Sequence, residues 1–516
     1  MQHRIKAGNL GAEGPAMLEA IEACVHCGFC LPACPTYESL AEEMDSPRGR
    51  IFLMKEVLEG GLALSEAAPY VDRCLGCLAC EPACPSGVEY GSLLAPFRSM
   101  AVKEGTGSAW SRLMRWTVLK ILPYPSRLRK ALFLGRFARW GRRLLPASIR
   151  SMLELSPGPL PAAQALEAVT PAEGETRSRV GLLLGCAQGV RAPGINAASA
   201  RVLSCNGVEV VAPPHQGCCG ALSIHSGARQ EARNMAQELF DIFDADLDAV
   251  LTNAAGCGSG ISEYPILFEG TEQSAEAGRF SSRVEDIAVF LERLGPVAPH
   301  KLRQPLRVAY QDACHLGHAQ GVREQPRRLL ELIPGLELVA VPDADSCCGS
   351  AGIYNIEQPR LAREIGDRKV DALLSTGAGL VASGNIGCIM QIRTRLRERG
   401  LKLPVLHTME VLDLAYRGEL ADFQGFCSSL FSMISASSPG FSSRGQWLRA
   451  GLRSSTWPGR AWCSLKASSR EMIRGPFKTE SFSPCTMLTF FPAPRSFSCI
   501  ESLVCLPSSG PSSTFR

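Results

Sequence analysis

Apolar and polar residues follow a helical period through the first hundred residues of the chain. Residues 14–23 place their apolar side chains on one side of a short helix, and residues 46–61 do so in a longer one. Ser46 and Pro47 are typical of a helix start, and Gly60 and Gly61 are typical of a helix end. The pattern therefore predicts a helical N-terminal part.

Beyond residue 178 the pattern changes to short apolar strands that alternate with helices. We expect strands within 179–186, 208–214 and 248–257, with helices near 195–207 and 232–243. The apolar run LRVAYQ starts a second stretch of the same kind at residue 306. Such alternation predicts small α/β units, each with a mainly parallel sheet.

Cysteines recur in this second half at nearly constant offsets. The first set is Cys186, Cys218, Cys219 and Cys257, and the second set is Cys314, Cys347, Cys348 and Cys388. Equivalent cysteines lie 128, 129 and 131 residues apart, which indicates a duplication. They fall at strand ends, where open α/β sheets place their sites. We interpret them as metal or cluster ligands, with buried structural or redox thiols as the alternative.

Two denser cysteine runs lie in the N-terminal part, and both have the spacing C-x2-C-x2-C-x3-C-P. The first run contains Cys24, Cys27, Cys30 and Cys34, and the second contains Cys74, Cys77, Cys80 and Cys84. This is the spacing of bacterial ferredoxins, in which the fourth cysteine of each run binds the other cluster. We therefore assign Cys24, Cys27, Cys30 and Cys84 to one [4Fe-4S] cluster, and Cys74, Cys77, Cys80 and Cys34 to the other.

Zinc and disulfides are the alternatives for these eight cysteines. Structural zinc takes four ligands, usually from two separate C-x2-C pairs, and does not need a third equally spaced thiol. Disulfides are typical of small secreted domains, whereas this chain has 516 residues and no apolar signal segment at its start. Two adjacent clusters would make the chain an electron carrier.

Several polar residues lie close to the cysteines. Arg48 and Arg50 either adjust a cluster potential, hold a partner, or form a solvated helix end. His26 lies inside the first run, and His215 and His315 lie beside the later cysteines. A ligand or proton-relay role for the last two histidines competes with ordinary polar packing.

Composition narrows the functional classes. The 22 cysteines favour a reducing compartment, and the net charge of +4 is too small to indicate nucleic acid binding. Apolar runs stay well short of the roughly 20 residues that a membrane span needs. We expect a cytoplasmic protein, either free or peripheral on the cytoplasmic face of the inner membrane.

Residues 108–152 are basic and apolar, with eleven Arg and Lys residues and no acidic residue. Pro123 and Pro125 are expected to divide this segment into two helices. Basic amphipathic helices that carry aromatic residues bind anionic membrane surfaces. A helical linker that packs its apolar stripe on the protein body is the alternative.

These patterns divide the chain into five parts. They are a di-cluster ferredoxin-type domain at 14–105, a basic helical segment with linker at 106–178, cysteine-rich domains at 179–300 and 301–417, and a disordered tail at 418–516. The predicted fold is a multi-domain α+β protein, in which an α-helical ferredoxin precedes two duplicated small α/β units. The tail is rich in Ser, Pro, Arg and Phe and shows no sustained period.

Together, the two ferredoxin runs and the two C…CCG…C repeats resemble the iron–sulfur subunit family of glycolate oxidase, also called its F subunit. The phrases CVHCGFC, SPRGRI, LEGG, GCAQG, GCCGA, DACHLGHAQ, CCGSAGIYNI and NIGC are similar to that family's pattern. The match runs in order from about residue 20 to residue 415, which leaves the tail outside it.

The resemblance implies a subunit of a membrane-associated complex. Partner flavoproteins that carry FAD would oxidise glycolate to glyoxylate, and this chain would pass the electrons through its clusters to a quinone-type acceptor. The chain lacks the G-x-G-x-x-G arrangement of a dinucleotide site, which agrees with that division of labour. Catalytic residues are accordingly not expected in this chain.

One departure concerns the end of each cysteine-rich repeat. Related heterodisulfide reductase domains end in C-x-x-C, whereas here Gly260 and Gln391 occupy the last position. A five-thiolate cluster is therefore in doubt, although four thiolates per copy remain. Alternative functions are the equivalent subunit of a lactate, glycerol-3-phosphate or heterodisulfide reductase-like complex, and a non-catalytic redox sensor or metal-stapled protein.

Overall fold

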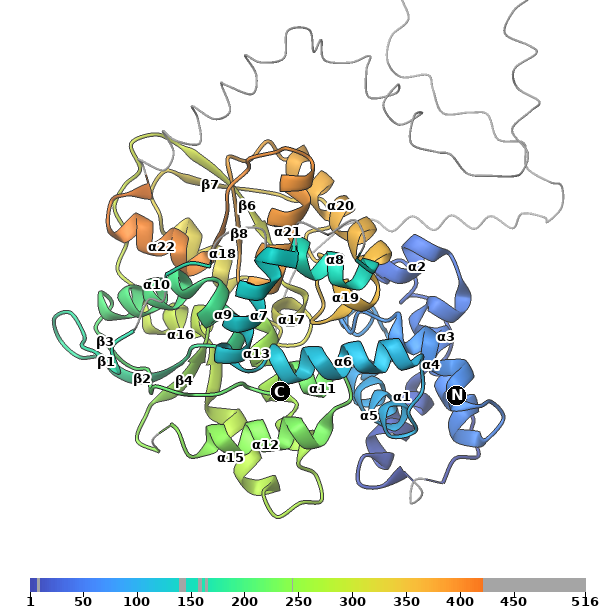
Figure 1. The fold of residues 1–516 in the computed structure, drawn as a ribbon. Coiled ribbons are helices and arrows are strands. Elements are labelled where there is room, and N and C mark those ends of the chain that lie inside the picture. The colour runs from blue at the N-terminus through green and yellow to red at the C-terminus, as the bar shows by residue number, and fades with distance from the viewer. Residues whose placement is uncertain (7–9, 139–144, 156–159, 163–165, 244, 421–516) are drawn as a thin grey trace, which may run out of the picture. The chain divides into compact units, whose positions relative to one another are not determined.

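The computed structural model describes residues 1–6, 10–138, 145–155, 160–162, 166–243 and 245–420 (Figure 1). In chain order these residues form a helical module, a group of basic helices and two α/β units. The predicted tail from residue 421 onward lies outside the described residues, as does Trp140 of the basic segment. The exact domain boundaries drawn from the sequence stay predictions.

The N-terminal module is helical, as predicted. Its elements are α1 Gly14–Ala23, α2 Pro35–Leu40, a 3-10 helix Glu43–Asp45, α3 Pro47–Glu59, α4 Leu64–Asp72 and α5 Tyr90–Lys103. The Ser46 hydroxyl accepts a hydrogen bond from the Gly49 amide at 3.0 Å and so caps α3 at its start. Gly60 ends the same helix in a left-handed conformation, with φ of 81°.

Apolar side chains from α1, α3 and α5 form the core of this module. Ile21, Met54, Leu93 and Phe97 are fully buried there. Burial of each such side chain stabilises the fold by roughly 1.5–3 kcal/mol. The packing fixes the helices that flank the two cysteine loops, and thereby fixes the loops.

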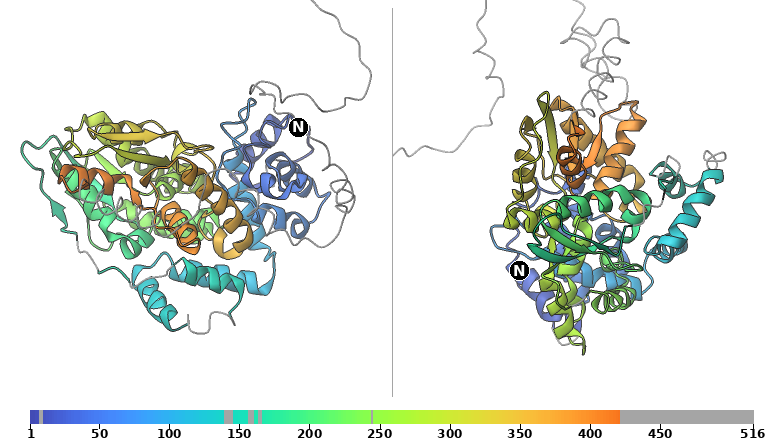
Figure 2. Two further views of the ribbon diagram at one scale, coloured as in Figure 1. Left: turned by 90° about the horizontal axis from the view of Figure 1, so that it is seen from above. Right: turned by 90° about the vertical axis from the view of Figure 1, so that its left-hand side faces the viewer.

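The basic segment forms three described helices, α6 Ala109–Ile121, α7 Pro125–Ala138 and α8 Ala147–Glu154. The predicted break at Pro123 and Pro125 lies between α6 and α7. The inner face of α6 buries Val118 against Ile353 and Ile356 of the second α/β unit. In both views of Figure 2 these cyan helices lie along the outside of the two α/β units.

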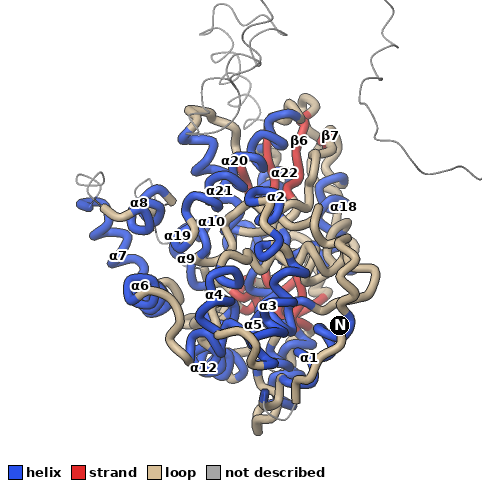
Figure 3. The backbone as a smooth tube through the Cα atoms, turned by 90° about the vertical axis from the view of Figure 1, so that its right-hand side faces the viewer, coloured by secondary structure: helices blue, strands red, loops and turns tan. Residues whose placement is uncertain are grey.

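In each α/β unit, helices pack around one sheet (Figure 3). The strands of the first are β1 Val169–Thr170, β2 Ser178–Leu183, β3 Val208–Val211, β4 Ala249–Thr252 and β5 Val284–Asp286. Its helices are α9 Cys186–Arg191, α10 Pro193–Ser204, α11 Ala221–His225, α12 Arg229–Phe240, α13 Ala255–Ser262, α14 Tyr264–Leu267, α15 Ser274–Arg283 and α16 Ile287–Leu294. The strand order is β1-β3-β2-β4-β5, and only the β1–β3 pairing is antiparallel within this sheet.

The second unit repeats this plan with one strand fewer. Its strands are β6 Leu306–Gln311, β7 Leu336–Val339, β8 Leu380–Ser383 and β9 Val405–His407. Its helices are α17 Cys314–Gly317, α18 Gln325–Glu331, α19 Tyr354–Glu357, α20 Pro359–Ser375, α21 Ile386–Glu398 and α22 Thr408–Tyr416. The order β7-β6-β8-β9 is wholly parallel. The predicted mainly parallel sheets are thus confirmed.

The two units share one hydrophobic core. Leu182 and Val208 of the first unit and Val308 and Leu380 of the second are fully buried in the same cluster. Helix α10 packs on α22, and α16 packs on α18, so equivalent helices of the two copies meet reciprocally. Such an arrangement is what a duplicated unit packing on itself produces.

The glycine of each Cys-Cys-Gly triplet is required by the backbone. Gly220 and Gly349 have φ of 74° and 81°, a region that other residues rarely adopt. A Cβ on Gly349 would lie 2.6 Å from the carbonyl oxygen of Ala362 on α20. The triplet therefore turns the chain sharply against the following long helix and directs two adjacent thiols into the unit.

Replacing Gly349 with alanine should cost more stability than the left-handed backbone alone explains. Gly321→Ala provides the matched control, because Gly321 has φ of 68° but no atom within 4 Å of the added Cβ. We expect the control to lose about 1–2 kcal/mol, and Gly349→Ala to lose about 1–3 kcal/mol more through overlap. Thermal or denaturant unfolding of both variants measures the difference, and equal losses would contradict the close packing.

Candidate redox site

The two N-terminal cysteine runs fold as a pair of similar loops. His26 and Gly28 have φ of 58° and 88° in the first loop, and Gly76 and Leu78 have φ of 64° and 58° in the second. The second and fourth backbone positions after the leading cysteine are therefore left-handed in both loops. A non-glycine residue pays roughly 1–2 kcal/mol for that conformation. The surrounding packing has to supply this energy.

Each loop helps to line a hollow that is ringed by thiols. The first hollow is lined by Cys24, Cys27, Cys30 and Cys84, with Cys80 also reaching it. The second is lined by Cys34, Cys74, Cys77 and Cys80. The structure thus brings the eight predicted cysteines together in the two groups that the sequence assigned, each with its fourth thiol taken from the other run.

The donor set of these hollows fits iron–sulfur clusters. Four thiols around a hollow match a cubane, which takes one thiolate on each iron. Burial raises the pKa of the Cys77 and Cys80 thiols well above the ordinary value. Cluster binding must therefore displace their protons.

Arg50 lies fully buried between the two loops, which excludes the alternative of a solvated helix end for this residue. Its guanidinium donates to the Tyr70 carbonyl at 2.8 Å and to the Thr36 hydroxyl at 3.0 Å. It also pairs with Asp45 at 3.0 Å and reaches the Cys34 sulfur at 3.9 Å.

The charge of Arg50 is retained despite this burial. Burial by itself lowers the pKa of the guanidinium, but the nearby Cys74, Tyr90, Cys34 and Asp45 raise the pKa above its ordinary value. Asp45 is shared with Arg73, which donates to it at 2.9 and 3.0 Å. A fixed positive charge therefore faces the thiols of the second hollow.

Two further arginines hold the loop backbones in the same way. Arg48 donates to the His26 carbonyl at 3.1 Å in the first loop. Arg98 donates to the Cys74 carbonyl at 2.6 Å in the second, and to the His225 carbonyl of the first α/β unit at 3.0 Å. Sequence reasoning missed Arg98, although it stands 50 residues after Arg48, the same offset as between the two runs.

Three side chains of the second α/β unit also hold the backbone of the second loop. His315 Nε2 bonds the Gly76 carbonyl at 3.1 Å, and His318 Nδ1 bonds the Cys77 carbonyl at 2.9 Å. The Tyr354 hydroxyl donates to the Arg73 carbonyl at 3.1 Å. Burial and then His225 lower the pKa of His315 to about 4, so this imidazole is neutral and donates its single N–H to the loop.

The later histidine and cysteine predictions have mixed outcomes. His315 packs and hydrogen-bonds rather than pointing at a thiol, and His215 is exposed at a loop with φ of 64°. The His26 ring packs edge-on against Phe52, with centroids 6.1 Å apart. Cys205 caps the end of α10 and is half-buried.

The four cysteines of each α/β unit form a chain of contacting thiols. Cys186 and Cys218 have their sulfurs 3.3 Å apart, and Cys219 interacts with both Cys218 and Cys257. In the second unit the sulfurs of Cys314 and Cys347 lie 4.0 Å apart, and Cys348 interacts with Cys347 and Cys388. The structure therefore gathers both predicted quartets, and the pKa of the Cys348 thiol is raised well above its ordinary value.

The position at which related domains carry a fifth cysteine is occupied by Gly260 in the first unit and by Gln391 in the second. A Cβ on Gly260 would lie 2.2 Å from the Cβ of Ala221, which leaves no space for a thiol. Gln391 is buried and donates to the Ala362 carbonyl at 2.9 Å. Each unit can therefore offer four thiolates, and the departure seen in the sequence has a steric cause in the first copy.

The second hollow lies directly against the second quartet. Cys77 packs in one cluster with Cys314 and Cys347, together with Leu75 and Tyr354. Negative charge on Cys314 also contributes to the raised pKa of Cys77, after burial. The two thiol groups are thus neighbours in one packed cluster, with the imidazoles of His315 and His318 bonded to the loop beside them.

Comparisons with known proteins agree with this architecture. Residues 20–88 match the 4Fe-4S dicluster domain family, and residues 180–262 and 308–393 each match the cysteine-rich domain family named CCG. A lactate utilization protein A of Geobacillus thermodenitrificans is 30% identical over 236 residues, which is 46% of this chain and 98% of that protein.

Longer matches come from two other bacteria. The probable glycolate oxidase iron-sulfur subunit of Bacillus subtilis is 38% identical over 411 residues, covering 75% of this chain and 92% of that protein. The glycolate oxidase iron-sulfur subunit of Escherichia coli is 35% identical over 403 residues, covering 77% of this chain and 95% of that protein. This identity, over at least three quarters of this chain and more than nine tenths of each relative, shows that the chain belongs to the family of glycolate oxidase iron–sulfur subunits.

Proposed function

We propose that this chain is the electron-transfer subunit of a complex that oxidises glycolate to glyoxylate. The observation that carries the proposal is the pair of thiol-ringed hollows in a chain that matches glycolate oxidase iron–sulfur subunits over nearly their whole length. Oxidation of glycolate releases two electrons and two protons. FAD on partner subunits would take these up, and a quinone-type acceptor would finally receive them.

In this proposal the chain itself performs no bond chemistry. Cys24, Cys27, Cys30 and Cys84 hold one [4Fe-4S] cluster, and Cys74, Cys77, Cys80 and Cys34 hold the second. Each bound cluster supplies one-electron redox chemistry, which divides the two-electron change at a flavin into single steps. The residues of the chain orient the clusters, exclude water and set the local charge.

The quartets Cys186, Cys218, Cys219, Cys257 and Cys314, Cys347, Cys348, Cys388 are proposed as further iron–sulfur or metal ligands. Support comes from the contacting thiols in each unit. The second quartet also abuts Cys77, which places it next to the second cluster site. A cluster or metal held by the second quartet would therefore lie next to the second cluster site.

The proposal is tested by substitution of cluster ligands in the assembled complex. Cys27→Ala and Cys77→Ala should each abolish glycolate-dependent reduction of a dye or quinone, because each removes one iron ligand from a different cluster. Cys205→Ala is the matched control, since Cys205 lies outside every ligand pattern and its thiol contacts the Val202 carbonyl. Unchanged turnover in both ligand variants would reject an electron-carrying role.

A lactate-oxidising complex is the second candidate, because the lactate utilization relative matches almost along its full length. Activity assays of the complex and its co-purifying flavoproteins with glycolate, lactate and glycerol 3-phosphate distinguish these two candidate functions. We expect glycolate to give the highest kcat/KM. Anaerobic metal analysis separates both from a zinc-stapled scaffold, which would contain zinc and no acid-labile sulfide.

Arg50 should raise the reduction potential of the second cluster, because its buried positive charge favours the more negative reduced state. We expect Arg50→Met to shift the midpoint potential of that cluster to lower values. It should also destabilise the fold by about 1–3 kcal/mol, because Asp45 keeps Arg73 as a partner while the Tyr70 carbonyl and Thr36 hydroxyl lose a buried donor. Redox titration followed by electron paramagnetic resonance measures the first effect, and thermal unfolding the second. Arg48→Met is the control, because the Arg48–Glu43 pair is partly exposed and costs at most about 1 kcal/mol.

A peripheral membrane contact through residues 108–152 is part of the same proposal. Among the described residues, no helix is both long and apolar enough to cross a bilayer. Trp110, Leu113 and Trp116 nevertheless form an exposed apolar face on α6, and Phe133, Leu134 and Phe137 are exposed on α7. With the basic residues of the segment, this surface fits the headgroup region of an anionic bilayer.

Replacing Trp110, Trp116 and Phe133 together with serine should weaken binding to vesicles that contain phosphatidylserine by at least about tenfold. The reason is that burial of each aromatic side chain contributes roughly 1.5–3 kcal/mol, and tenfold corresponds to about 1.4 kcal/mol. Val297→Ser, at an exposed position outside the segment, should bind as the unaltered chain does. Equal binding of the triple variant in a vesicle sedimentation assay would exclude this surface.

A further inference from the structure

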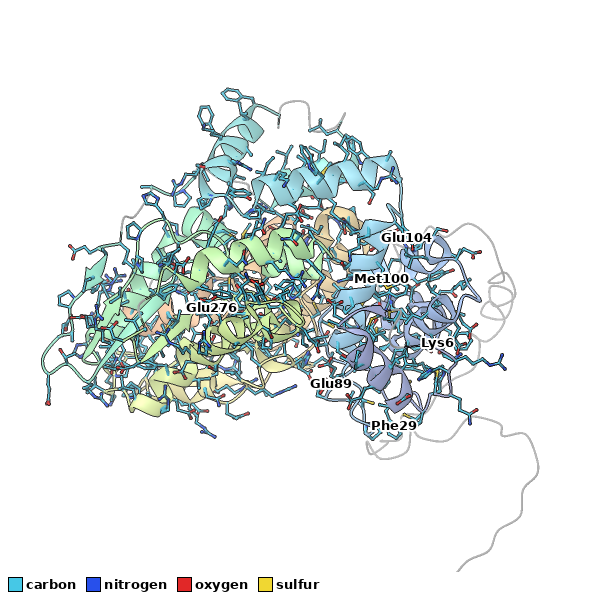
Figure 4. All side chains as sticks on the ribbon, turned by 90° about the horizontal axis from the view of Figure 1, so that it is seen from below. Lys6, Phe29, Glu89, Met100, Glu104 and Glu276 are labelled. Atoms are coloured by element: carbon cyan, nitrogen blue, oxygen red, sulfur yellow. The ribbon has the colours of Figure 1, made fainter. Side chains whose placement is uncertain are left out.

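The first cysteine loop carries large apolar side chains on its outer face. Val25 and Phe29 are 66% and 65% exposed, and Cys27 between them is exposed as well. Phe52 of α3 is 39% exposed beside them, packed against His26. Figure 4 shows Phe29 at the rim of the N-terminal module, directed away from it. We call Val25, Phe29 and Phe52 the collar.

The equivalent face of the second loop is covered. Leu75, Cys77 and Ala79 occupy the positions of Val25, Cys27 and Phe29, and their exposures are 6%, 8% and 9%. Their cover is the second α/β unit, whose Cys314, Cys347 and Tyr354 pack in the same cluster. The three positions that are exposed to solvent in the first loop are thus buried by packing within the chain in the second loop.

The two loops are equivalent in conformation, so this comparison is between like surfaces. Both have left-handed residues at the second and fourth positions, and each is held by an arginine, Arg48 or Arg98, on a loop carbonyl. An isolated exposed apolar residue needs no explanation. In the first loop, three exposed apolar side chains lie around the exposed Cys27. The second α/β unit covers the equivalent positions of the second loop. This difference indicates that a partner protein covers the first loop.

We propose that the collar is the docking surface of the flavin-bearing partner protein, and that electrons enter the chain there, close to Cys27. This inference rests on the proposed function and adds the place of entry. One electron at a time would pass from the reduced flavin of the partner to the first cluster, with no bond formed or broken. The second loop cannot serve as the entry, because the second α/β unit already covers it.

The surroundings of the collar have the character of a protein interface. Apolar residues lie at its centre, and the Arg48–Glu43 ion pair, whose side chains are 26% and 43% exposed, lies beside the loop. An apolar centre with a charged rim is the usual arrangement in protein–protein contacts. Phenylalanine at such a centre is a typical anchor, since it buries a large area with little loss of side-chain freedom.

The test measures binding of the purified flavoprotein subunits to the cluster-loaded chain. We expect Val25→Glu with Phe29→Glu to weaken binding at least tenfold and to slow glycolate-driven reduction of the clusters. The iron content and the reduction by dithionite check that the variant retains both clusters. The milder Phe29→Ala should weaken binding less. Val297→Glu is the control, with a side chain 57% exposed outside the collar.

Each outcome has a distinct meaning. Unchanged binding by the double glutamate variant with intact clusters would overturn the collar as the docking surface. Dissociation of a homodimer by the same variant, with flavoprotein binding retained, would also overturn it, because a second copy of this chain would then be the occupant. If the unaltered chain bound no flavoprotein subunit, the proposed function would fail before the collar was tested.

Discussion

The packing of the second cysteine loop against the second α/β unit determines how the modules can work together. Loops rich in cysteine and glycine have little apolar surface of their own and are held by other parts of a protein. Here His315, His318 and Tyr354 bond the backbone carbonyls of Gly76, Cys77 and Arg73, and Arg98 bonds the Cys74 carbonyl. Backbone carbonyls accept all of these bonds, so the contact depends on loop conformation and leaves the thiols free for iron.

Duplication followed by divergence explains the asymmetry of the molecule. The chain contains two cysteine loops and two α/β units, yet among the residues that the structure describes only the second loop and the second unit share a thiol-containing core. His315 directly follows Cys314, whereas Ala187 follows Cys186 at the equivalent position. A change of this kind gives one copy a hydrogen-bonding role that the other copy does not have. Equal numbers of ligands in the two units therefore do not mean equal places in an electron path.

Features that depend on residues close together in the sequence could be predicted. Contacts between side chains and backbone groups that are distant in the sequence could not. Cysteine spacing predicted the two groups of thiols that meet in the fold, because a cluster takes most of its ligands from one short loop. The caps at Ser46 and Gly60 and the repeat of the CCG unit were equally local. Arg50 was misjudged in part, because burial of an arginine depends on Asp45 and Thr36, which fold onto it from other segments. Arg98, His318 and Tyr354 act through carbonyls far away in the chain, and only the 50-residue offset from Arg48 could have pointed to one of them.

Unequal covering of the two loops also affects their chemical durability. Iron–sulfur cubanes are attacked by dioxygen and by chelators at whichever corner solvent can reach. The thiol at position 27 is open to solvent, whereas its counterpart at position 77 is enclosed by protein. The isolated subunit therefore has one fragile centre and one protected centre. A cluster held at the open corner would therefore set the lifetime of the isolated subunit in air.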